Sequence, residues 1–319
     1  MTTPGNTFLT YQAVGNREDL SNVIYNIDPF ATPFMSGVER VTTQATKHEW
    51  QTQALAAANS ANALLEGGNA VNDTVIPTTR LNNYHQISGK VAQVAGTQQA
   101  VKKAGRTNEM DYQIMLKGRE LKRDMETILL ANQGASAADS ATNRKVGAVL
   151  SWIFSNTSKA STGGSDPSST GAGVSTRTDG TMRAFTEPML KGVLQSVWVN
   201  GGEPDTILVG GFNKQQFSLF TGRASPIEQT ASKKIVAAVS VYESDFGTMK
   251  VVADRFMRAR DVLVLQMDLW AMGTLPGRNM IAFPIANTGD ATQKEILSEY
   301  TLEARNEKGN GGVFDVTSA

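Results

Sequence analysis

Residues 51–75, in the N-terminal half of the chain, carry too little bulky apolar surface to fold around a core of their own. They include seven alanines, four asparagines and no aromatic residue. Fixing the backbone of one residue costs roughly 1–2 kcal/mol, which small side chains cannot offset by burial. The flanking segments Lys47–Thr52 and Tyr84–Val91 alternate in the manner of strands. We therefore expect residues 46–103 to form a long β-hairpin that projects from the body of the molecule.

Residues 1–45, which precede this hairpin, have the features of an extended arm. They are polar, show no sustained periodicity and are interrupted by Pro4, Pro29 and Pro33, which favour extended or turn conformations. A short stretch, Leu20–Ile27, is apolar enough to anchor the arm as a helix on another surface. The arm and the hairpin together predict an N-terminal half that packs mainly against neighbouring copies of the chain.

The clearest predicted helix lies within residues 104–135. Thr107 or Asn108 is a suitable N-cap, and Asn132–Gly134 ends the segment. Apolar residues recur with helical spacing and charged residues fill the other positions. The apolar positions are Met110, Ile114, Leu121, Met125 and Ile128, and the charged ones are Lys117, Arg119, Glu120, Lys122, Arg123, Asp124 and Glu126. At about 25 residues such a helix is roughly 37 Å long, enough to act as a spine.

Residues 136–277 mix helical and strand patterns, which predicts an α/β domain. A helix begins at Thr186, with Pro188 in its first turn, and ends at Gly201–Gly202. Further elements are a short helix at 212–220 and strands at 207–209, 236–243, 248–253 and 262–265. Residues 155–181 form a loop rich in Gly, Ser and Thr, to which no role is assigned.

Residues 278–319 predict a final amphipathic hairpin. Alternate residues from Ile296 to Ala304 fall on one face of a strand, and Asn306–Gly312 reads as a turn. We expect Val313–Val316 to return as the partner strand. A half-buried hairpin needs a cover, and the helix within 104–135 is the best candidate.

Composition narrows the classes of function. Cysteine is absent, which excludes disulfides, thiol catalysis and cysteine-ligated metals, and only His48 and His85 offer imidazole groups. We interpret both as ordinary strand-surface histidines and expect no metal or other cofactor. Thirty basic residues balance thirty acidic ones, so the chain has no net charge, whereas a dedicated nucleic-acid binder is usually positively charged. A helix needs about 20 apolar residues to span a bilayer, and no apolar run in the sequence comes close to that length. We therefore expect no membrane partner.

Enzymatic interpretations find little support in the motifs. The glycine pairs at 67–68, 201–202 and 210–211 lie outside any phosphate-binding motif and are explained by turns and caps. A soluble hydrolase that uses a pair of carboxylates is the enzymatic alternative. Such a pair would have to lie together, but Asp124 and Glu126 cannot share one helical face. We expect the helix charges to be solvated or to pair with a neighbouring copy, and the protein not to be an enzyme.

The order of these elements resembles the Hong Kong 97-type fold of tailed-phage capsid proteins. Asp19–Pro29 followed by Thr32–Phe34 is similar to the opening of the podovirus-type major head protein family, once described only as a domain of unknown function. Further blocks that resemble this family occur in order along the chain: Glu49–Gln51, Glu66–Gly67, Gly96–Gln98, Glu120–Glu126, Arg144–Gly147, Tyr242–Thr248 and Glu299–Glu303.

The resemblance implies a major capsid protein with an α+β fold. Its implied parts are an N-terminal arm (1–45), an extended loop (46–103), a spine helix of the peripheral domain (104–135), an axial domain (136–277) and C-terminal strands that return to the peripheral domain (278–319). Hexamers and pentamers would build an icosahedral head around double-stranded DNA. An encapsulin-like shell with protein cargo is the alternative within the same fold.

Copies of the same chain are the main expected partners. Trp50 stands out as an interface candidate, because aromatic residues are enriched at binding hot spots and no private core is expected there. The candidate interface residues are Phe30, Phe34, Trp50, Glu66, Glu120, Arg123 and Arg144.

The family pattern begins near Asp19, so we also expect a separate scaffolding protein rather than a fused one. A portal protein, weak non-specific contacts with packaged DNA, and room for decoration proteins complete the expected partners. The expected location is the virion, after assembly in the bacterial host cytoplasm.

Overall fold

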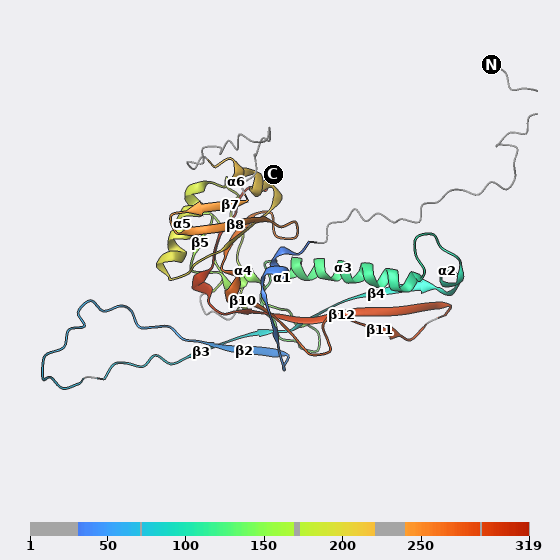
Figure 1. Ribbon diagram of the computed structural model, residues 1–319, viewed down its shortest axis with the longest axis horizontal. Helices are drawn as coiled ribbons and strands as arrows, with labels where there is room; N and C mark the ends of the chain where they lie inside the picture. The colour runs from blue at the N-terminus through green and yellow to red at the C-terminus, as the bar shows by residue number, and fades with distance from the viewer. Residues whose placement is uncertain (1–30, 71, 169–172, 221–239, 288, 319) are drawn as a thin grey trace, which may run out of the picture.

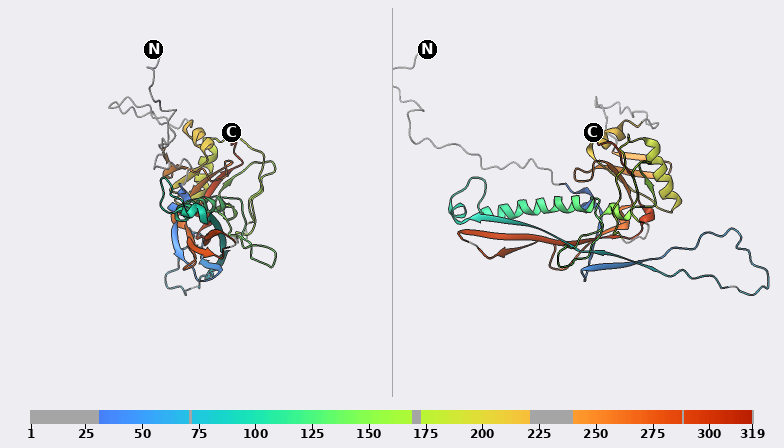
Figure 2. Two further views of the ribbon diagram at one scale, coloured as in Figure 1. Left: turned by 90° about the vertical axis from the view of Figure 1, so that its right-hand side faces the viewer. Right: turned by 180° about the vertical axis from the view of Figure 1, so that it is seen from behind.

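The computed structural model describes residues 31–70, 72–168, 173–220, 240–287 and 289–318. The molecule is elongated, with a long helix and paired strands at one end, a long loop at the other and an α/β unit above them (Figure 1). The view from behind shows the same arrangement (Figure 2). No helix within these residues is long and apolar enough to cross a bilayer.

The first sheet follows the long axis of the molecule and is organised by its longest strand, β12. Its strands are β1 (Glu39–Thr42), β10 (Trp270–Thr274), β12 (Ala291–Ala304), β11 (Ile281–Ile285) and β4 (Gln86–Ala95). β12 pairs antiparallel with β4, β10 and β11, whereas β1 pairs parallel with β10. Because segments from both ends of the chain meet in this sheet, it forms only when distant parts of the sequence come together.

Helix α3 (Glu109–Leu129) covers this sheet, as the sequence predicts. Asn108 is its N-cap, and the side-chain oxygen of Asn108 accepts hydrogen bonds from the backbone amides of Met110 and Asp111. Its 21 residues make a helix of about 31 Å. Leu121 and Leu129 are fully buried in the core beneath the helix, whereas Met110 packs in a smaller cluster on β4.

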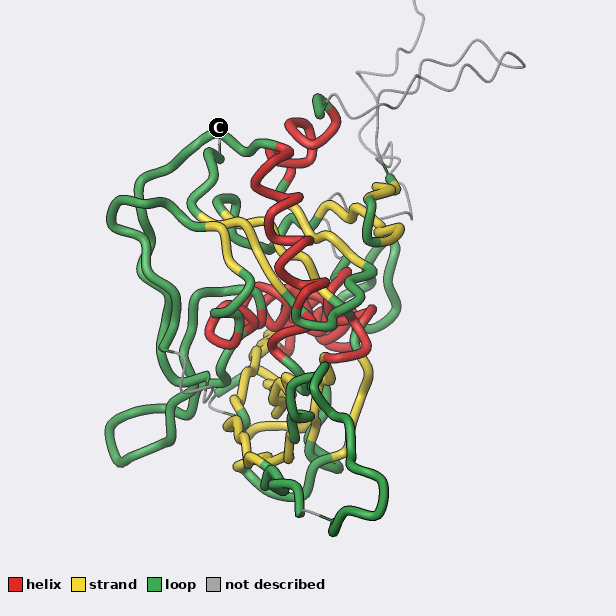
Figure 3. The backbone as a smooth tube through the Cα atoms, turned by 90° about the vertical axis from the view of Figure 1, so that its left-hand side faces the viewer, coloured by secondary structure: helices red, strands yellow, loops and turns green. Residues whose placement is uncertain are grey.

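The second sheet belongs to the α/β unit. Its strands, in spatial order, are β5 (Thr157–Ser158), β13 (Gly311–Phe314), β9 (Asp261–Leu265), β6 (Thr206–Val209), β8 (Gly247–Ala253) and β7 (Val241–Ser244). Alternate residues of β6 serve different cores: Leu208 faces the core shared with α3, and Ile207 faces α5 (Glu187–Val199). Helix α5 lies across the strands (Figure 3). Burial on both faces explains the continuous apolar runs in the central strands.

The remaining elements are shorter. They are β2 (Lys47–Thr52), β3 (Thr79–Tyr84), α1 (Pro33–Gly37), α2 (Gly96–Ala100), α4 (Val149–Trp152), α6 (Gly211–Ser218) and the 3₁₀ turns η2 (Met267–Leu269) and η3 (Glu307–Gly309).

The ends of α5 match the prediction from the sequence. Thr186 occupies the N-cap position, although its hydroxyl makes no capping hydrogen bond, and Pro188 lies in the first turn. Gly201 ends the helix with a φ of 84°, which residues with a Cβ rarely adopt. The predicted strands at 207–209, 248–253 and 262–265 are confirmed by β6, β8 and β9. Part of the predicted strand 236–243 lies outside the described residues.

The predicted hairpin is correct for its first strand and wrong for much of its second. β2 pairs with β3, and the register joins Lys47 to Tyr84 and Thr52 to Thr79. The pairing ends at Tyr84, and the segment after His85 becomes β4, which pairs with β12. The inward residues of β4, Ala92 and Val94, need the cover that Met110 of α3 supplies. That burial explains why the strand belongs to the first sheet.

The predicted C-terminal pairing is also wrong. β13 does not return to β12 but joins the second sheet, antiparallel to β9 and parallel to β5. The adjoining glycines pack closely instead of forming an open turn. A Cβ on Gly311 would lie 2.7 Å from the Val193 side chain and from the Asn156 carbonyl oxygen. These glycines therefore let β13 enter a crowded core beside α5.

Candidate subunit interface

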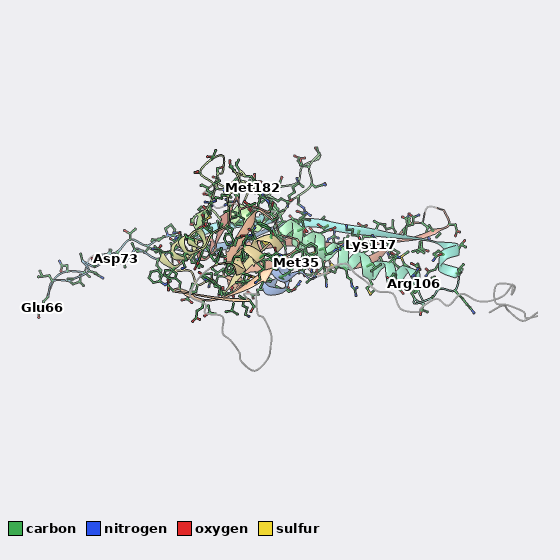
Figure 4. The ribbon with its side chains drawn as sticks, turned by 90° about the horizontal axis from the view of Figure 1, so that it is seen from above. Met35, Glu66, Asp73, Arg106, Lys117 and Met182 are labelled. Atoms are coloured by element: carbon green, nitrogen blue, oxygen red, sulfur yellow. The ribbon has the colours of Figure 1, made fainter. Side chains whose placement is uncertain are left out.

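The loop between β2 and β3, residues 53–78, is the most exposed segment that the structure describes. The side chain of Gln53 donates a hydrogen bond to the Ile76 carbonyl oxygen at 2.7 Å near the loop base. Farther out lie four large aliphatic residues with exposures of 85–95%: Leu55, Leu64, Leu65 and Val75. Glu66 follows the two leucines near the tip, far from the body (Figure 4). Glu66 is thus placed in the segment where contact with another molecule would hide apolar surface.

Trp50, in contrast, is held by its own chain. Its indole Nε1 donates a hydrogen bond to the carbonyl oxygen of Ala304 at 2.9 Å, and its ring lies 5.4 Å from that of Trp152. The side chain packs against the main core beneath α3. The premise that Trp50 has no private core is therefore wrong, since β12 and α4 pass beside it. Its role in a subunit interface stays a prediction.

The aromatic residues predicted for the arm have different positions. Phe30 lies outside the described residues. Phe34 is fully buried in its own chain's core, and its ring meets Trp270 edge-on at 6.3 Å. The interface assignment of Phe34 is therefore wrong for the folded chain, because its side chain has no surface left for a neighbour.

The charged candidates mostly have partners within the chain. Glu120 forms an ion pair with Lys117 at 2.9 Å, and Arg144 forms one with Glu299 at 2.7 Å. Arg123 is partly exposed on α3, and its carbonyl oxygen accepts a hydrogen bond from Thr127. As subunit contacts these residues stay predictions.

Two interpretations of buried polar groups need correction. His85 is fully buried rather than on a strand surface; its Nε2 lies 2.7 Å from the Thr43 hydroxyl and its Nδ1 3.2 Å from the Thr46 carbonyl oxygen. Burial lowers the pKa of His85, so the ring stays neutral near pH 7. Glu126 is likewise fully buried, not solvated as the pattern of helix charges suggests.

His48 fixes the base of the hairpin to β12. Its Nε2 lies 2.9 Å from the Glu303 carboxylate, and this contact lowers the pKa of Glu303. Across the described ranges, no group of three or more His, Asp or Glu residues is arranged to hold a metal ion. Both imidazoles thus make hydrogen bonds within the chain.

Sequence reasoning missed an ionic network that fastens the Gly/Ser/Thr-rich segment to the C-terminus. The Asp315 carboxylate accepts hydrogen bonds from the backbone amides of Ala160 and Gly180 and from the Arg260 guanidinium, at 2.8–3.1 Å. Although burial acts to raise it, these donors hold the pKa of Asp315 below its usual value. The Arg177 guanidinium stacks on the Phe314 ring, 3.3 Å from its centroid.

A sequence signal for this network existed. Charged residues are few in 155–181, namely Lys159, Asp166, Arg177 and Asp179. In the structure all four form ion pairs. The isolated charges thus mark the points where this otherwise neutral loop is attached to the rest of the subunit. The low complexity of the loop obscured this signal.

In the described residues, the candidate side chains are held mainly by contacts within the chain, and the loop 53–78 is left exposed. A family model described as the SU10 major capsid protein matches residues 3–317. A curated relative, the major capsid protein of Escherichia phage Phieco32, is 37% identical over 126 residues, which cover 40% of this chain and 36% of the relative. The chain thus aligns with about a third of that relative's length.

Solved structures share the fold at low sequence identity. The capsid of cyanophage A-1(L) superposes with a TM-score of 0.64 at 13% identity, covering 97% of this chain and 98% of the other. An encapsulin from Synechococcus elongatus gives 0.57 at 10% identity, covering 96% and 94%. These likenesses confirm the α+β Hong Kong 97-type fold. With the match over almost its whole length, the chain belongs to the SU10 major capsid protein family and is a structural component of a phage virion rather than an enzyme.

Proposed function

We propose that this subunit assembles with copies of itself into the hexamers and pentamers of an icosahedral head that encloses packaged double-stranded DNA. The observation that carries the proposal is the loop 53–78, whose large aliphatic side chains have exposures of 85–95%. Apolar surface that the subunit leaves in water favours association, at about 25 cal/mol per Å² covered. A neighbouring copy that covers the loop would contribute a modest free energy at each contact. Repeated over the whole shell, these contacts would make the closed lattice stable.

In this proposal the parts of the subunit have distinct positions. The α/β unit, which the sequence assigns to residues 136–277, would be the axial domain at the capsomer centre. The spine helix and first sheet would be the peripheral domain, with the loop draped over the next subunit and the arm reaching another. Glu66, Glu120, Arg123 and Arg144 are the charged residues that would contact neighbours.

Further partners belong to the same proposal. A separate scaffolding protein would guide assembly, a portal protein would occupy one vertex, and decoration proteins would have room to bind outside. Contacts with packaged DNA would be weak and non-specific, because positive and negative charges balance over the chain.

The test compares two loop variants of the full chain. Leu64→Ser combined with Leu65→Ser removes exposed apolar groups, and Asn62→Ser combined with Asn69→Ser is the matched control in the same loop. We expect both to keep the wild-type unfolding midpoint, since exposed substitutions change stability by less than about 0.5 kcal/mol. Negative-stain microscopy should show shells for the control and a large loss of shells for the leucine variant. Equal yields of shells would contradict the proposed role of the loop.

The cargo separates this proposal from an encapsulin-like compartment. Particles purified from infected cells should contain DNA that resists added nuclease. A co-purifying enzyme cargo without protected DNA would overturn the phage-head proposal and favour the compartment.

A further inference from the structure

Glu126 of α3 attaches the start of the described chain to the body of the subunit. Its side chain is fully buried. One carboxylate oxygen accepts a hydrogen bond from the amide of Phe34 at 2.7 Å, and the other accepts one from Met35 at 2.9 Å. Both amides belong to α1, close to the start of the described chain. Met35 lies between α3 and the α/β unit (Figure 4).

The carboxyl group of Asp254, from the second sheet, interacts with that of Glu126. Asp254 follows β8 and is 2% exposed, and its backbone amide donates to the Val209 carbonyl oxygen at 2.9 Å. Its Oδ1 accepts a hydrogen bond from the amide of Phe256 at 2.8 Å. Its Oδ2 is buried and receives no hydrogen bond from another group in the described chain. A proton carried by one of the two carboxyl groups would supply the missing donor.

Among the described residues, no ion pair joins a cation to Glu126 or Asp254. Helix α1 carries no titratable side chain, and Arg123 of α3 and Arg255 beside Asp254 form no ion pair with either group. Within the described ranges, the ion pairs of Lys, Arg and His all involve other carboxylates. Glu299 shows the contrast, since this equally buried carboxylate is held by both Arg144 and Arg278.

Burial without a cation favours the neutral acid. Desolvation is the largest cause that raises the pKa of Glu126, to about 8, and the charge of Asp254 raises it further. Burial also raises the pKa of Asp254. Two carboxyl groups this close titrate as a unit, and the first proton that binds is shared between them.

We propose that Glu126 and Asp254 form a proton-dependent latch that joins three parts of the subunit: α1, helix α3 and the second sheet. With one proton shared, the two carboxyl groups attract each other and α1 stays docked on α3. When the proton leaves, two buried negative charges face each other and the contact opens. The latch thus allows α1 to be released from the body without unfolding the sheets.

The direction of the pH effect follows from the raised pKa. An opened latch exposes carboxyl groups that ionise with ordinary pKa values near 4, whereas the closed latch keeps its proton up to about pH 8. Closure therefore binds a proton and is favoured at low pH. Its stability falls as pH rises through that interval and levels off above it.

Hydrogen–deuterium exchange of the full-length, unassembled subunit tests the latch. Peptides covering residues 31–38 should lose protection by up to about tenfold per pH unit between pH 5 and 8, after correction for intrinsic exchange. Peptides from α5 should show no such slope and serve as the internal control. Asp254→Asn combined with Glu126→Gln removes both ionisable groups and should flatten the profile, whereas each single variant leaves one buried carboxyl and should shift the profile without abolishing the slope. Glu120→Gln, on the same helix, should leave it unchanged.

Several outcomes would overturn the proposal. A wild-type profile without a slope, or one that the double variant reproduces, would do so. Infrared spectroscopy adds a measurement that needs no variant: a buried protonated carboxyl band should be present at pH 6.5 and absent at pH 9. Absence of that band at pH 6.5 would also reject the latch, even if the double variant failed to fold.

Discussion

Replacing Trp50 with alanine should destabilise the subunit itself. A fully buried tryptophan loses about 3–5 kcal/mol on truncation, and a partly buried one loses less. The lost hydrogen bond from Nε1 to the Ala304 carbonyl oxygen adds about 0.5–1.5 kcal/mol. We therefore expect Trp50→Ala to lower the free energy of unfolding by about 2–4 kcal/mol. Trp50→Phe keeps a ring against Trp152 and should cost about 1 kcal/mol, mainly the hydrogen bond.

The assay is urea unfolding of unassembled subunits, followed by far-ultraviolet circular dichroism. Trp198→Ala is the matched control, because Trp198 is 57% exposed on α5 and should cost less than about 1 kcal/mol. A Trp50→Ala subunit with the wild-type midpoint, but unable to form shells, would refute the packing argument. In that case the interface interpretation drawn from the sequence would be the correct one.

Two further predictions concern buried charges. Arg144→Ala removes one of the two ion-pair partners of Glu299 and leaves Arg278 as the other. The free energy of unfolding should therefore fall by about 1–3 kcal/mol at pH 7 in the same urea assay. A loss below about 0.3 kcal/mol would contradict a stabilising role of the Arg144–Glu299 ion pair. Asp315→Asn should also destabilise the subunit near pH 7. Since the pKa of Asp315 is lowered in the folded state, its contribution is complete above the ordinary aspartate value of about 4 and is lost as pH falls further. The gap in thermal midpoint between wild type and variant should therefore close on acidification, and a gap that stays constant down to pH 2 would contradict the assignment.

Local patterns predicted the helices better than the pairing of strands. The N-cap Asn108 and the apolar spacing of α3 depend on residues within a few turns, so the sequence alone reveals them. The partner of a strand depends instead on distant segments. Nothing within Gln86–Ala95 shows that this strand continues away from the hairpin to pair with β12. Likewise, Gly311–Gly312 reads as a turn in sequence, although both glycines admit close packing in the second sheet.

The positions of the interface candidates in the fold could not be predicted for a similar reason. A sequence shows that Trp50 and Phe34 are aromatic, but not that β12 and α3 pass beside them. Glu126 is buried beneath α1, whereas the nearby charged residues Glu120 and Asp124 of α3 are partly exposed, and no local sequence signal predicts this difference. The exposed position of Glu66 could be predicted, because the lack of bulky apolar residues around it is visible in the local sequence.

The division within the hairpin bears on how assembly would be specified. Its base is fixed to β12 through His48 and Trp50, whereas the distal loop has exposed leucines and few ties of its own. A fixed base directs the loop before any neighbour arrives, which reduces the entropy that an association must overcome. Loosening the base should therefore weaken assembly even if every exposed leucine is retained. Trp50 would then affect the shell through the direction of the loop and not through a contact of its own.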